Sequence, residues 1–354
     1  MPVVTVEWLE GRTRAQKQEL VSEITKIVHR VGGSPMERIQ VVLHDVPADN
    51  WGRGGALVSS LQSALPTPPA REGANSAQPV SHETAFSLPL LDQQVRKFDL
   101  EQPRFEGMPV IGPHKPGYLY FLYRRHGDDY RPDELGVRSS ASGVIVCMEH
   151  SGTHIDAVCH QADAQMLYGG IPAAEACNGK GFTAHAIEEV APMLTPGVLL
   201  DAAAERGVPS LDAGHLVTAT DLEACCRRQG VDIRPGDVVL VRTGNAVFWH
   251  DPERFLAGPG MDASAAEWLA HKGVLAVGAD NMAWDVIGLR DPKTDCQLPG
   301  HLILLARHGI NIIENLQLEE LAAAGHSRFT FICTPLKFIG ATGSPVRPLA
   351  VVNA

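Results

Sequence analysis

The sequence lacks the features of membrane-spanning, secreted and nucleic-acid-binding proteins. No apolar run approaches the ~18 residues of a membrane span, and the N-terminus has neither the basic segment nor the apolar core of a secretory leader. The seven cysteines contain no Cys-x-x-Cys pair, so a disulfide framework is not indicated. A formal net charge of −11 argues against nucleic acid or an anionic membrane as a partner. We therefore expect a cytoplasmic protein with reduced thiols and a small-molecule substrate.

The chain is long enough for about two domains. It has 354 residues against the usual ~150 per domain, and 44% of them are apolar, which allows sizeable cores. Three zones are visible: a compact unit at 1–62, a linker at 63–94 rich in Pro, Ala and Ser, and a large domain at 95–354. The linker composition is typical of a semi-flexible spacer.

The first zone is predicted to be a β-α-β unit. Val3–Leu9 and Ile39–Leu43 are β-branched, apolar strand candidates, and Thr13 with Gln16 has the spacing of a capping box that begins a helix between them. Gly32–Gly33 ends that helix. Strand, helix and strand in this order imply parallel strands with a right-handed crossover. So short a unit leaves one face of its sheet uncovered, so we expect it to pack against copies of itself, as a homo-oligomer, or against another domain.

The large domain is predicted to be α/β, because strands and helices alternate late in the chain. The predicted strands are Tyr118–Tyr123, Gly143–Cys147, Val238–Arg242, Val274–Gly278 and Ile310–Glu314. The predicted helices are Asp221–Gln229, Ala263–Lys272, His301–Arg307 and Glu319–Ala324. The alternating aromatics Tyr118, Phe121 and Tyr123 are interpreted as core residues, and His114 as a solvated loop histidine.

A cluster of potential metal ligands follows the strand Gly143–Cys147. His150, His154, Asp156 and His160 lie within eleven residues. His154 and Asp156 are two apart and share one side of an extended segment, while the Ser-Gly-Thr turn can fold His150 toward them. Two imidazoles and a carboxylate suit Zn²⁺ or Mn²⁺ and leave a position open for water, and His160 is placed to act as general acid or base. The alternative is a set of structural histidines that cap a loop.

Two distant residues are candidates for the same site. Glu314 ends a predicted strand, where a buried carboxylate is costly unless it is paired or bound to metal and where open α/β sheets form their sites. His301 opens the preceding helix. The alternatives for Glu314 are a helix cap or a surface ion pair.

These residues carry a resemblance to a known family. The pattern His150-x-Gly-Thr-His154-x-Asp156, with His160, resembles the hallmark of the cyclase/kynurenine-formamidase-like hydrolases, and the tract from Gly300 through Leu316 is similar to their second motif. The resemblance covers roughly 98–351. It implies a swivelling β/β/α fold and hydrolysis of a small amide, cyclic amide or lactone, as in arylformamidases and isatin hydrolases.

The resemblance also implies roles for individual residues. His150, His154 and Asp156 would hold a divalent metal, His301 and Glu314 would join them where two ions are bound, and His160 would be the acid/base. One departure concerns the substrate, because several formamidases carry proline where this chain has Val158. The neighbouring Cys159 is interpreted as a packing residue rather than a nucleophile.

The first zone resembles a second family. Pro2 follows Met1, whose removal would leave a secondary amine that can act as a base if its pKa is lowered, and Arg12 could bind a carboxylate. With Trp51 and the glycines after it, these residues look like the 4-oxalocrotonate tautomerase family. The resemblance implies Pro2 as general base, Arg12 as carboxylate ligand and Trp51 as a pocket aromatic. Gln40 stands where the family has a second arginine, and Arg38, two residues away and expected on the same strand face, could replace it.

The sequence thus predicts a cytoplasmic, homo-oligomeric enzyme with one or two Zn or Mn ions. Its large domain would be a hydrolase and its first zone a tautomerase, in the breakdown of an aromatic or heteroaromatic compound. Two alternatives stay open: a metal-dependent lyase or dehydratase, and a tautomerase-like unit that serves only for oligomerisation.

Overall fold

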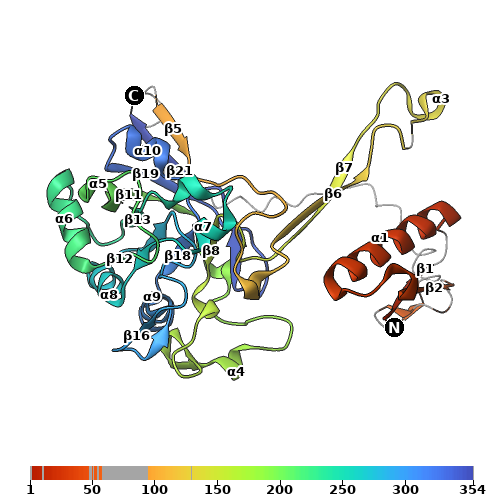
Figure 1. Ribbon diagram of the computed structural model, residues 1–354, viewed down its shortest axis with the longest axis horizontal. Coiled ribbons are helices and arrows are strands. Elements are labelled where there is room, and N and C mark those ends of the chain that lie inside the picture. Colours follow the sequence, from red (N-terminus) through yellow and green to blue (C-terminus); the bar gives the residue numbers. More distant parts are fainter. Residues whose placement is uncertain are drawn as a thin grey trace, which may run out of the picture. The chain divides into compact units, whose positions relative to one another are not determined.

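The computed structural model describes residues 2–9, 12–47, 50, 52–53, 56–57, 95–128 and 130–353. The chain divides into two compact units, Met1–Ala85 and Phe86–Ala354, which we treat separately (Figure 1). The predicted linker at 63–94 lies outside the described residues, so the linker stays a prediction. No helix among the described residues is long and apolar enough to cross a membrane.

The first unit has the predicted β-α-β order. It consists of β1 (Val3–Leu9), α1 (Arg14–Gly32), the 3-10 turn η1 (Met36–Arg38), β2 (Gln40–Val46), β3 (Gly52–Arg53) and β4 (Ala56–Leu57). β1 and β2 pair in parallel, with Val3 opposite Gln40. The capping box is confirmed, since the Thr13 side chain accepts from Gln16 N and the Gln16 side chain accepts from Thr13 N at 2.9 Å. The helix ends at Gly33, whose φ of 65° lies in the left-handed region.

None of the residues in this unit whose exposure is described is fully buried. Helix α1 buries no residue, and the apolar side chains of Ile27 and Val31 are 43% and 79% exposed. The described part of the unit therefore has no closed core, which is the situation that the sequence predicted for a module that needs a partner.

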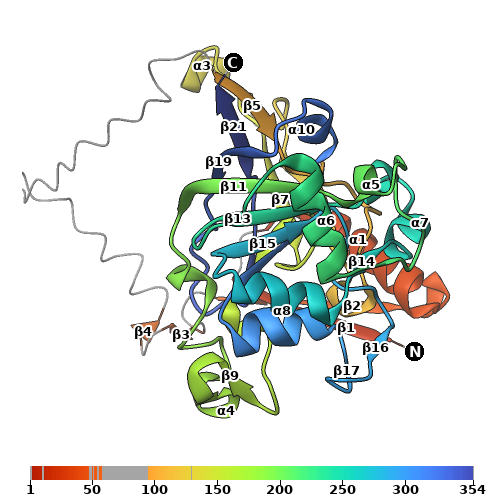
Figure 2. The same ribbon diagram turned by 90° about the vertical axis from the view of Figure 1, so that its left-hand side faces the viewer.

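The second unit is built on a nine-stranded mixed sheet (Figure 2). Its order is β20 (Gly343–Pro345), β8 (His154–Asp156), β18 (Asn311–Glu314), β15 (Ala276–Ala279), β13 (Val238–Arg242), β11 (Met193–Asp201), β19 (Arg328–Cys333), β21 (Leu349–Asn353) and β5 (Val95–Asp99). The strands β11, β13, β15 and β18 are parallel to one another, and the other pairings are antiparallel.

The central strands are buried on both faces, which explains their continuous apolar sequences. Val239 and Val241 of β13 belong to one apolar cluster and Val238 and Leu240 to another. The first cluster includes residues of α6 (Ala219–Gln229), α8 (Ala263–His271) and the π-helical segment η9 (Leu302–Arg307). Figure 2 shows α6 and α8 in front of the sheet.

Shorter elements connect the sheet and its layers. The short strands are β9 (Met166–Leu167), β10 (Ile171–Pro172), β12 (Leu216–Val217), β14 (Gly260–Met261), β16 (Arg290–Asp291) and β17 (Cys296–Gln297). The short helices are α3 (Pro132–Leu135), α4 (Ala173–Ala176), α5 (Ala202–Glu205), α7 (Pro252–Leu256), α9 (Pro299–His301) and α10 (Glu319–Ala323). The remaining 3-10 turns are η4 (Gly112–His114), η5 (Val158–His160), η6 (Tyr168–Gly170), η7 (Ile187–Glu189) and η8 (Asn245–Phe248). The predicted helices are confirmed to within two residues, except that 302–307 is a π-helix rather than part of an α-helix.

Strands β6 (Tyr118–Arg124) and β7 (Ser142–Cys147) form a separate antiparallel ribbon that extends away from the large sheet (Figure 1). The interpretation of its aromatics as core is wrong for Phe121 and Tyr123, which are 53% and 74% exposed. A two-stranded ribbon has no second layer to cover either face, so alternation of apolar residues along it does not produce burial.

Candidate metal centre

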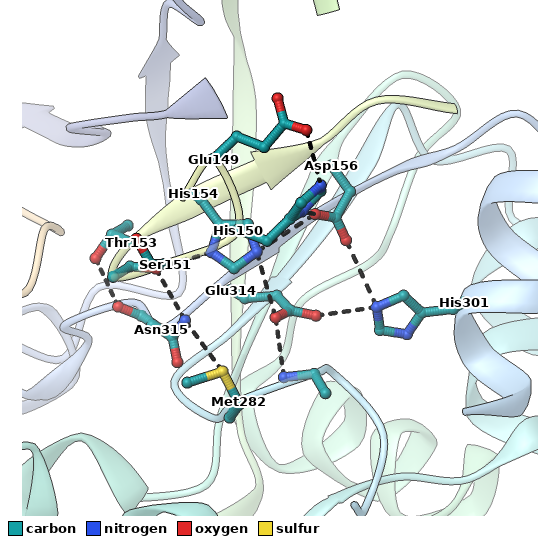
Figure 3. Close-up of polar contacts among 12 residues, drawn as sticks. Glu149, His150, Ser151, Thr153, His154, Asp156, Met282, His301, Glu314 and Asn315 are labelled. Atoms are coloured by element: carbon teal, nitrogen blue, oxygen red, sulfur yellow. Dashed lines mark hydrogen bonds and ion pairs between the residues drawn. The ribbon is translucent and has the colours of Figure 1, made fainter. Parts of the chain in front are cut away.

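The pairing of three strands brings His154, Asp156 and Glu314 together. β8 lies between β20 and β18, and His154 is directly opposite Glu314. His154 Nε2 lies 3.3 Å from Asp156 Oδ1 and 3.5 Å from Glu314 Oε2. The expectation that residues two apart face one point is confirmed, and all three side chains are buried (Figure 3).

His301 reaches the same point from the other side of the site. Its Nε2 lies 3.2 Å from Glu314 Oε1 and 3.5 Å from Asp156 Oδ2. His150 enters from the loop before β8, with Nδ1 2.7 Å from Asp156 Oδ1. The two alternatives for Glu314, a helix cap and a surface ion pair, are wrong, because Glu314 is buried among histidines.

A turn at Gly152 lets the loop between His150 and His154 fold back. Gly152 has a φ of 64°, and a Cβ on it would lie 2.5 Å from an Arg104 nitrogen. The Arg104 guanidinium donates to the carbonyls of Ser151 and Thr153, on either side of the glycine. The turn therefore needs glycine both for its backbone conformation and for the approach of Arg104.

Substitution of Gly152 by Ala tests this packing. We expect the free energy of unfolding to fall by about 1–2 kcal/mol from the left-handed backbone, with a further loss as Arg104 is displaced. Gly207→Ala is the matched control, since Gly207 has a φ of 69° and open space where a Cβ would lie. Urea denaturation of both variants measures the difference. Equal losses would show that Arg104 does not shape the turn.

His160 lies against His150. Their rings stack with centroids 3.9 Å apart. Burial, and after it the neighbouring His150, His301 and His154, lowers the pKa of His160 to about 3 against the opposing influence of Asp156. His160 therefore carries a neutral imidazole, which can accept a proton or bind a metal.

Two overlapping groups of side chains could hold a metal. His150, Asp156 and His160 form one, and Asp156, His301 and Glu314 form the other, with ligand atoms within 4.8 Å of one another in each. Although burial opposes it, the adjacent His160 and His150 hold the pKa of Asp156 well below its usual value. Asp156 is therefore a carboxylate shared by both groups.

The hydrogen bonding of these carboxylates fits a bound cation. Asp156 Oδ2 and Glu314 Oε1 are buried oxygens without a hydrogen-bond partner, and both face His301 Nε2. Buried polar atoms are ordinarily hydrogen-bonded, and buried charges are paired or bind metals. Imidazole and carboxylate are also the ligands expected for Zn²⁺ or Mn²⁺.

Several polar residues near the site were not found from the sequence, among them His114, Thr342 and Glu149. His114 lies with its ring centroid 5.0 Å from that of His150, so its interpretation as a solvated loop histidine is wrong. Thr342 Oγ1 lies 2.7 Å from His150 Nε2 and donates to Glu149 Oε1 at 2.5 Å. His114 and Thr342 lie far from the histidine motif in the sequence, and Glu149 directly precedes it. None of the three belongs to a sequence pattern that would indicate a role.

Cys159 is confirmed as a packing residue. It is 3% exposed, and burial, with Glu149 next in effect, raises the pKa of its thiol to about 12. A thiol that stays protonated at neutral pH is not a nucleophile.

The candidate residues of the first unit are only partly described. Pro2 is half-buried at the start of β1, with its carbonyl accepting from Gln40 N at 3.0 Å. Arg12 is exposed just before α1. The placement of Arg38 on the strand face of Gln40 is wrong, because Arg38 ends the 3-10 turn η1 and the strand begins after it. Trp51 lies outside the described residues.

Comparison with known proteins gives two family matches. Residues 98–286 match a family model described as "Putative cyclase", and residues 2–60 match one described as "Tautomerase enzyme". A solved structure of a novel cyclase is 30% identical, with a TM-score of 0.64 over 73% of this chain and 89% of that one. Isatin hydrolase A from Ralstonia solanacearum is 24% identical, with a TM-score of 0.57 over 79% of this chain and all of that one, and shares the fold. A probable tautomerase of Listeria monocytogenes is 43% identical over 61 residues, which are 17% of this chain and all of the relative.

Proposed function

The chain belongs to the cyclase family and carries a tautomerase-family domain at residues 2–60, and from this premise we propose that it is a metal-dependent hydrolase with a fused tautomerase. Its substrate would be a small amide, cyclic amide or lactone, as for an arylformamidase or an isatin hydrolase. The observation that carries the proposal is the pair of buried oxygens, Asp156 Oδ2 and Glu314 Oε1, that have no hydrogen-bond partner and face only the Nε2 of His301 at ion-pair distance.

Five residues would hold one or two Zn or Mn ions. They are His150, His154, Asp156, His301 and Glu314. When bound, a divalent ion of this kind acts as a Lewis acid toward water and toward a substrate carbonyl. Two ions could share the Asp156 carboxylate, because both candidate groups include it; the group with His150 also includes His160, which we keep as the acid or base.

His160 would move the proton in this reaction. It stacks on His150, and it is intermediate in exposure, whereas His150, His154 and His301 are buried. A neutral imidazole there can accept a proton as the attacking oxygen adds and return it to the leaving nitrogen or oxygen.

The apolar surroundings of the site favour a substrate with an aromatic or apolar part. Met282 Sδ lies 3.7 Å from the amide nitrogen of Asn315, and Ala283 N donates to Glu314. Both belong to an apolar cluster with Met108, Trp249 and Phe255. Partly buried side chains that pack on the cluster include Phe105, Val110, Tyr118 and Phe248.

Hydrolysis in ¹⁸O-labelled water tests the reaction type. The full chain, loaded with Zn²⁺ or Mn²⁺, is screened with aryl formamides, isatins and cyclic imides. We expect one label in the new carboxylate of the product, and loss of turnover after chelation that the added metal restores. An unlabelled product formed by loss of water or by elimination would overturn the hydrolase in favour of a lyase or dehydratase.

The first unit would contribute both an activity and an assembly. Pro2 would be the base, Arg12 the carboxylate ligand and Trp51 a pocket residue. Because the described part of this unit has no buried residue, we expect the full chain to be a homo-oligomer. Light scattering measures its molar mass, and a monomer at micromolar concentration would contradict this.

The fusion itself suggests successive reactions on one compound. A tautomerase interconverts enol and keto forms, and a hydrolase opens or cleaves the carbonyl compound, as in aromatic or heteroaromatic catabolism in a cytoplasm. This coupling fails if no product of one domain is a substrate of the other.

A further inference from the structure

The loop 281–285 touches both distant members of the metal centre. It joins β15 to the region before α9. Ala283 N donates to Glu314 Oε2 at 2.9 Å, and Asp285 Oδ2 lies 2.9 Å from His301 Nδ1. One short loop thus meets the two candidate ligands that lie outside the histidine motif.

The backbone of this loop is strained. Ala283 and Trp284 have φ values of 70° and 52°, a region that costs about 1–2 kcal/mol for each residue with a side chain. Burial holds the conformation: Trp284 is 0% exposed, and the Asn281 side chain donates to the Trp284 carbonyl at 2.9 Å. Strain of this kind persists where the surrounding structure fixes it, and it is common at functional sites.

Asp285 accepts two backbone hydrogen bonds from the beginning of the next helix, α9. Oδ1 accepts from Gly300 N at 2.6 Å, and Oδ2 accepts from His301 N at 3.2 Å and faces His301 Nδ1. The side chain is 1% exposed. The opposite nitrogen of the ring, His301 Nε2, lies 3.5 Å from Asp156 Oδ2 and 3.2 Å from Glu314 Oε1, the two buried oxygens without a hydrogen-bond partner.

We propose that Asp285 is a positioning residue of the metal centre. Its carboxylate holds His301 as the Nδ1–H tautomer, so that the lone pair on Nε2 points toward Asp156 and Glu314. A carboxylate can only accept at this position, so Nδ1 must carry the proton. Nε2 is then the ligand atom, and the two backbone donors fix the ring at the helix start. The inference rests on the proposed metal site. Outer carboxylates that orient a ligating histidine contribute about 10- to 100-fold in metal affinity.

The first measurement needs no variant. Long-range ¹H–¹⁵N spectra of the metal-free full chain distinguish the two tautomers of each histidine, and loss of one signal in His301→Gln identifies His301. We expect a proton on Nδ1. Burial opposes it, but Asp156, Asp285 and Glu314 raise the pKa of His301 well above its usual value, so the spectra are recorded at a pH at which the ring is neutral. A neutral His301 that carries its only proton on Nε2 overturns the proposal, whether or not the protein binds metal.

The second measurement compares two buried aspartates. In Asp285→Asn an amide replaces the carboxylate, and we expect a mixture of tautomers and a 10- to 100-fold weaker binding of Zn²⁺ by calorimetry. Asp280→Asn is the matched control: Asp280 is 0% exposed and accepts from the backbone of Thr243 and Gly244, but it does not contact a histidine. Equal losses in the two variants would reduce Asp285 to a structural residue. If the native chain binds no divalent metal, the proposed function fails, while the tautomer of His301 still decides the role of Asp285.

Discussion

The Asp156→Asn variant is expected to lose tight metal binding and at least on the order of 1,000-fold in hydrolytic turnover. Asp156 is the one residue common to both groups of candidate ligands. Its Oδ1 faces His150 and its Oδ2 faces His301, so the neutral amide removes the charge at the centre of the site. Loss of an ion that stabilises the transition state by several kcal/mol corresponds to a factor of this size.

The substitution preserves shape, which makes the outcome specific to charge. Metal content by elemental analysis and kcat on the best formamide or isatin substrate are measured for native and variant chains. Asp237→Asn is the control, since Asp237 is 3% exposed, pairs with Arg328 and lies outside the ligand set. A variant at Asp156 that keeps both metal and turnover would contradict the metal assignment, and one that keeps metal but loses turnover would restrict Asp156 to catalysis.

The part of the site that is local in sequence could be predicted from the sequence. His154 and Asp156 are two apart on one strand, and strand geometry alone places them on one side. Glu314 was also predictable, because a carboxylate at the end of a buried strand is costly unless it is paired or bound to a metal. What the sequence could not supply was the strand order that puts β18 beside β8, and hence Glu314 opposite His154.

The supporting residues were beyond sequence reasoning for a physical reason. His114, Thr342 and Asp285 act through contacts over long sequence separations, and none lies in a periodic pattern. The same limit explains the error at the β6–β7 ribbon, where the pattern of apolar residues was read correctly but the absence of a covering layer was not visible. Periodicity reports which residues share a face, and only the tertiary structure decides whether that face is covered.

In the first unit, the local structure was predictable from the sequence, but the arrangement of the candidate tautomerase residues was not. The capping box, the helix end and the parallel strands follow from short sequence signals. The role given to Arg38 depended on a strand that would include it, but the chain turns through η1 before β2 begins. The strand register therefore does not support the idea that Arg38 takes the place of the family's second arginine.

The Pro2→Ala variant is expected to reduce tautomerase turnover by about 100-fold or more while hydrolysis stays unchanged. A base positioned for proton transfer contributes 10²- to 10⁴-fold, and Pro2 is held at the start of β1 by the bond from Gln40 to its carbonyl. Alanine keeps an N-terminal amine but makes it primary and frees its φ angle, so the amine loses its fixed direction. Mass spectrometry first establishes that Met1 is absent, and ultraviolet absorbance then follows ketonisation of an aryl enolpyruvate.

The control for Pro2 is Pro35→Ala, which replaces an exposed proline at the start of η1 in the same unit. Both variants should keep the native molar mass, because neither substitution removes an apolar side chain from α1 or β2. Loss of tautomerase turnover in Pro2→Ala alone would establish the proline as the base. Unchanged turnover in every reaction, with the oligomer intact, would instead leave the unit as an oligomerisation module, and the metal centre of the large unit would then account for all of the catalysis.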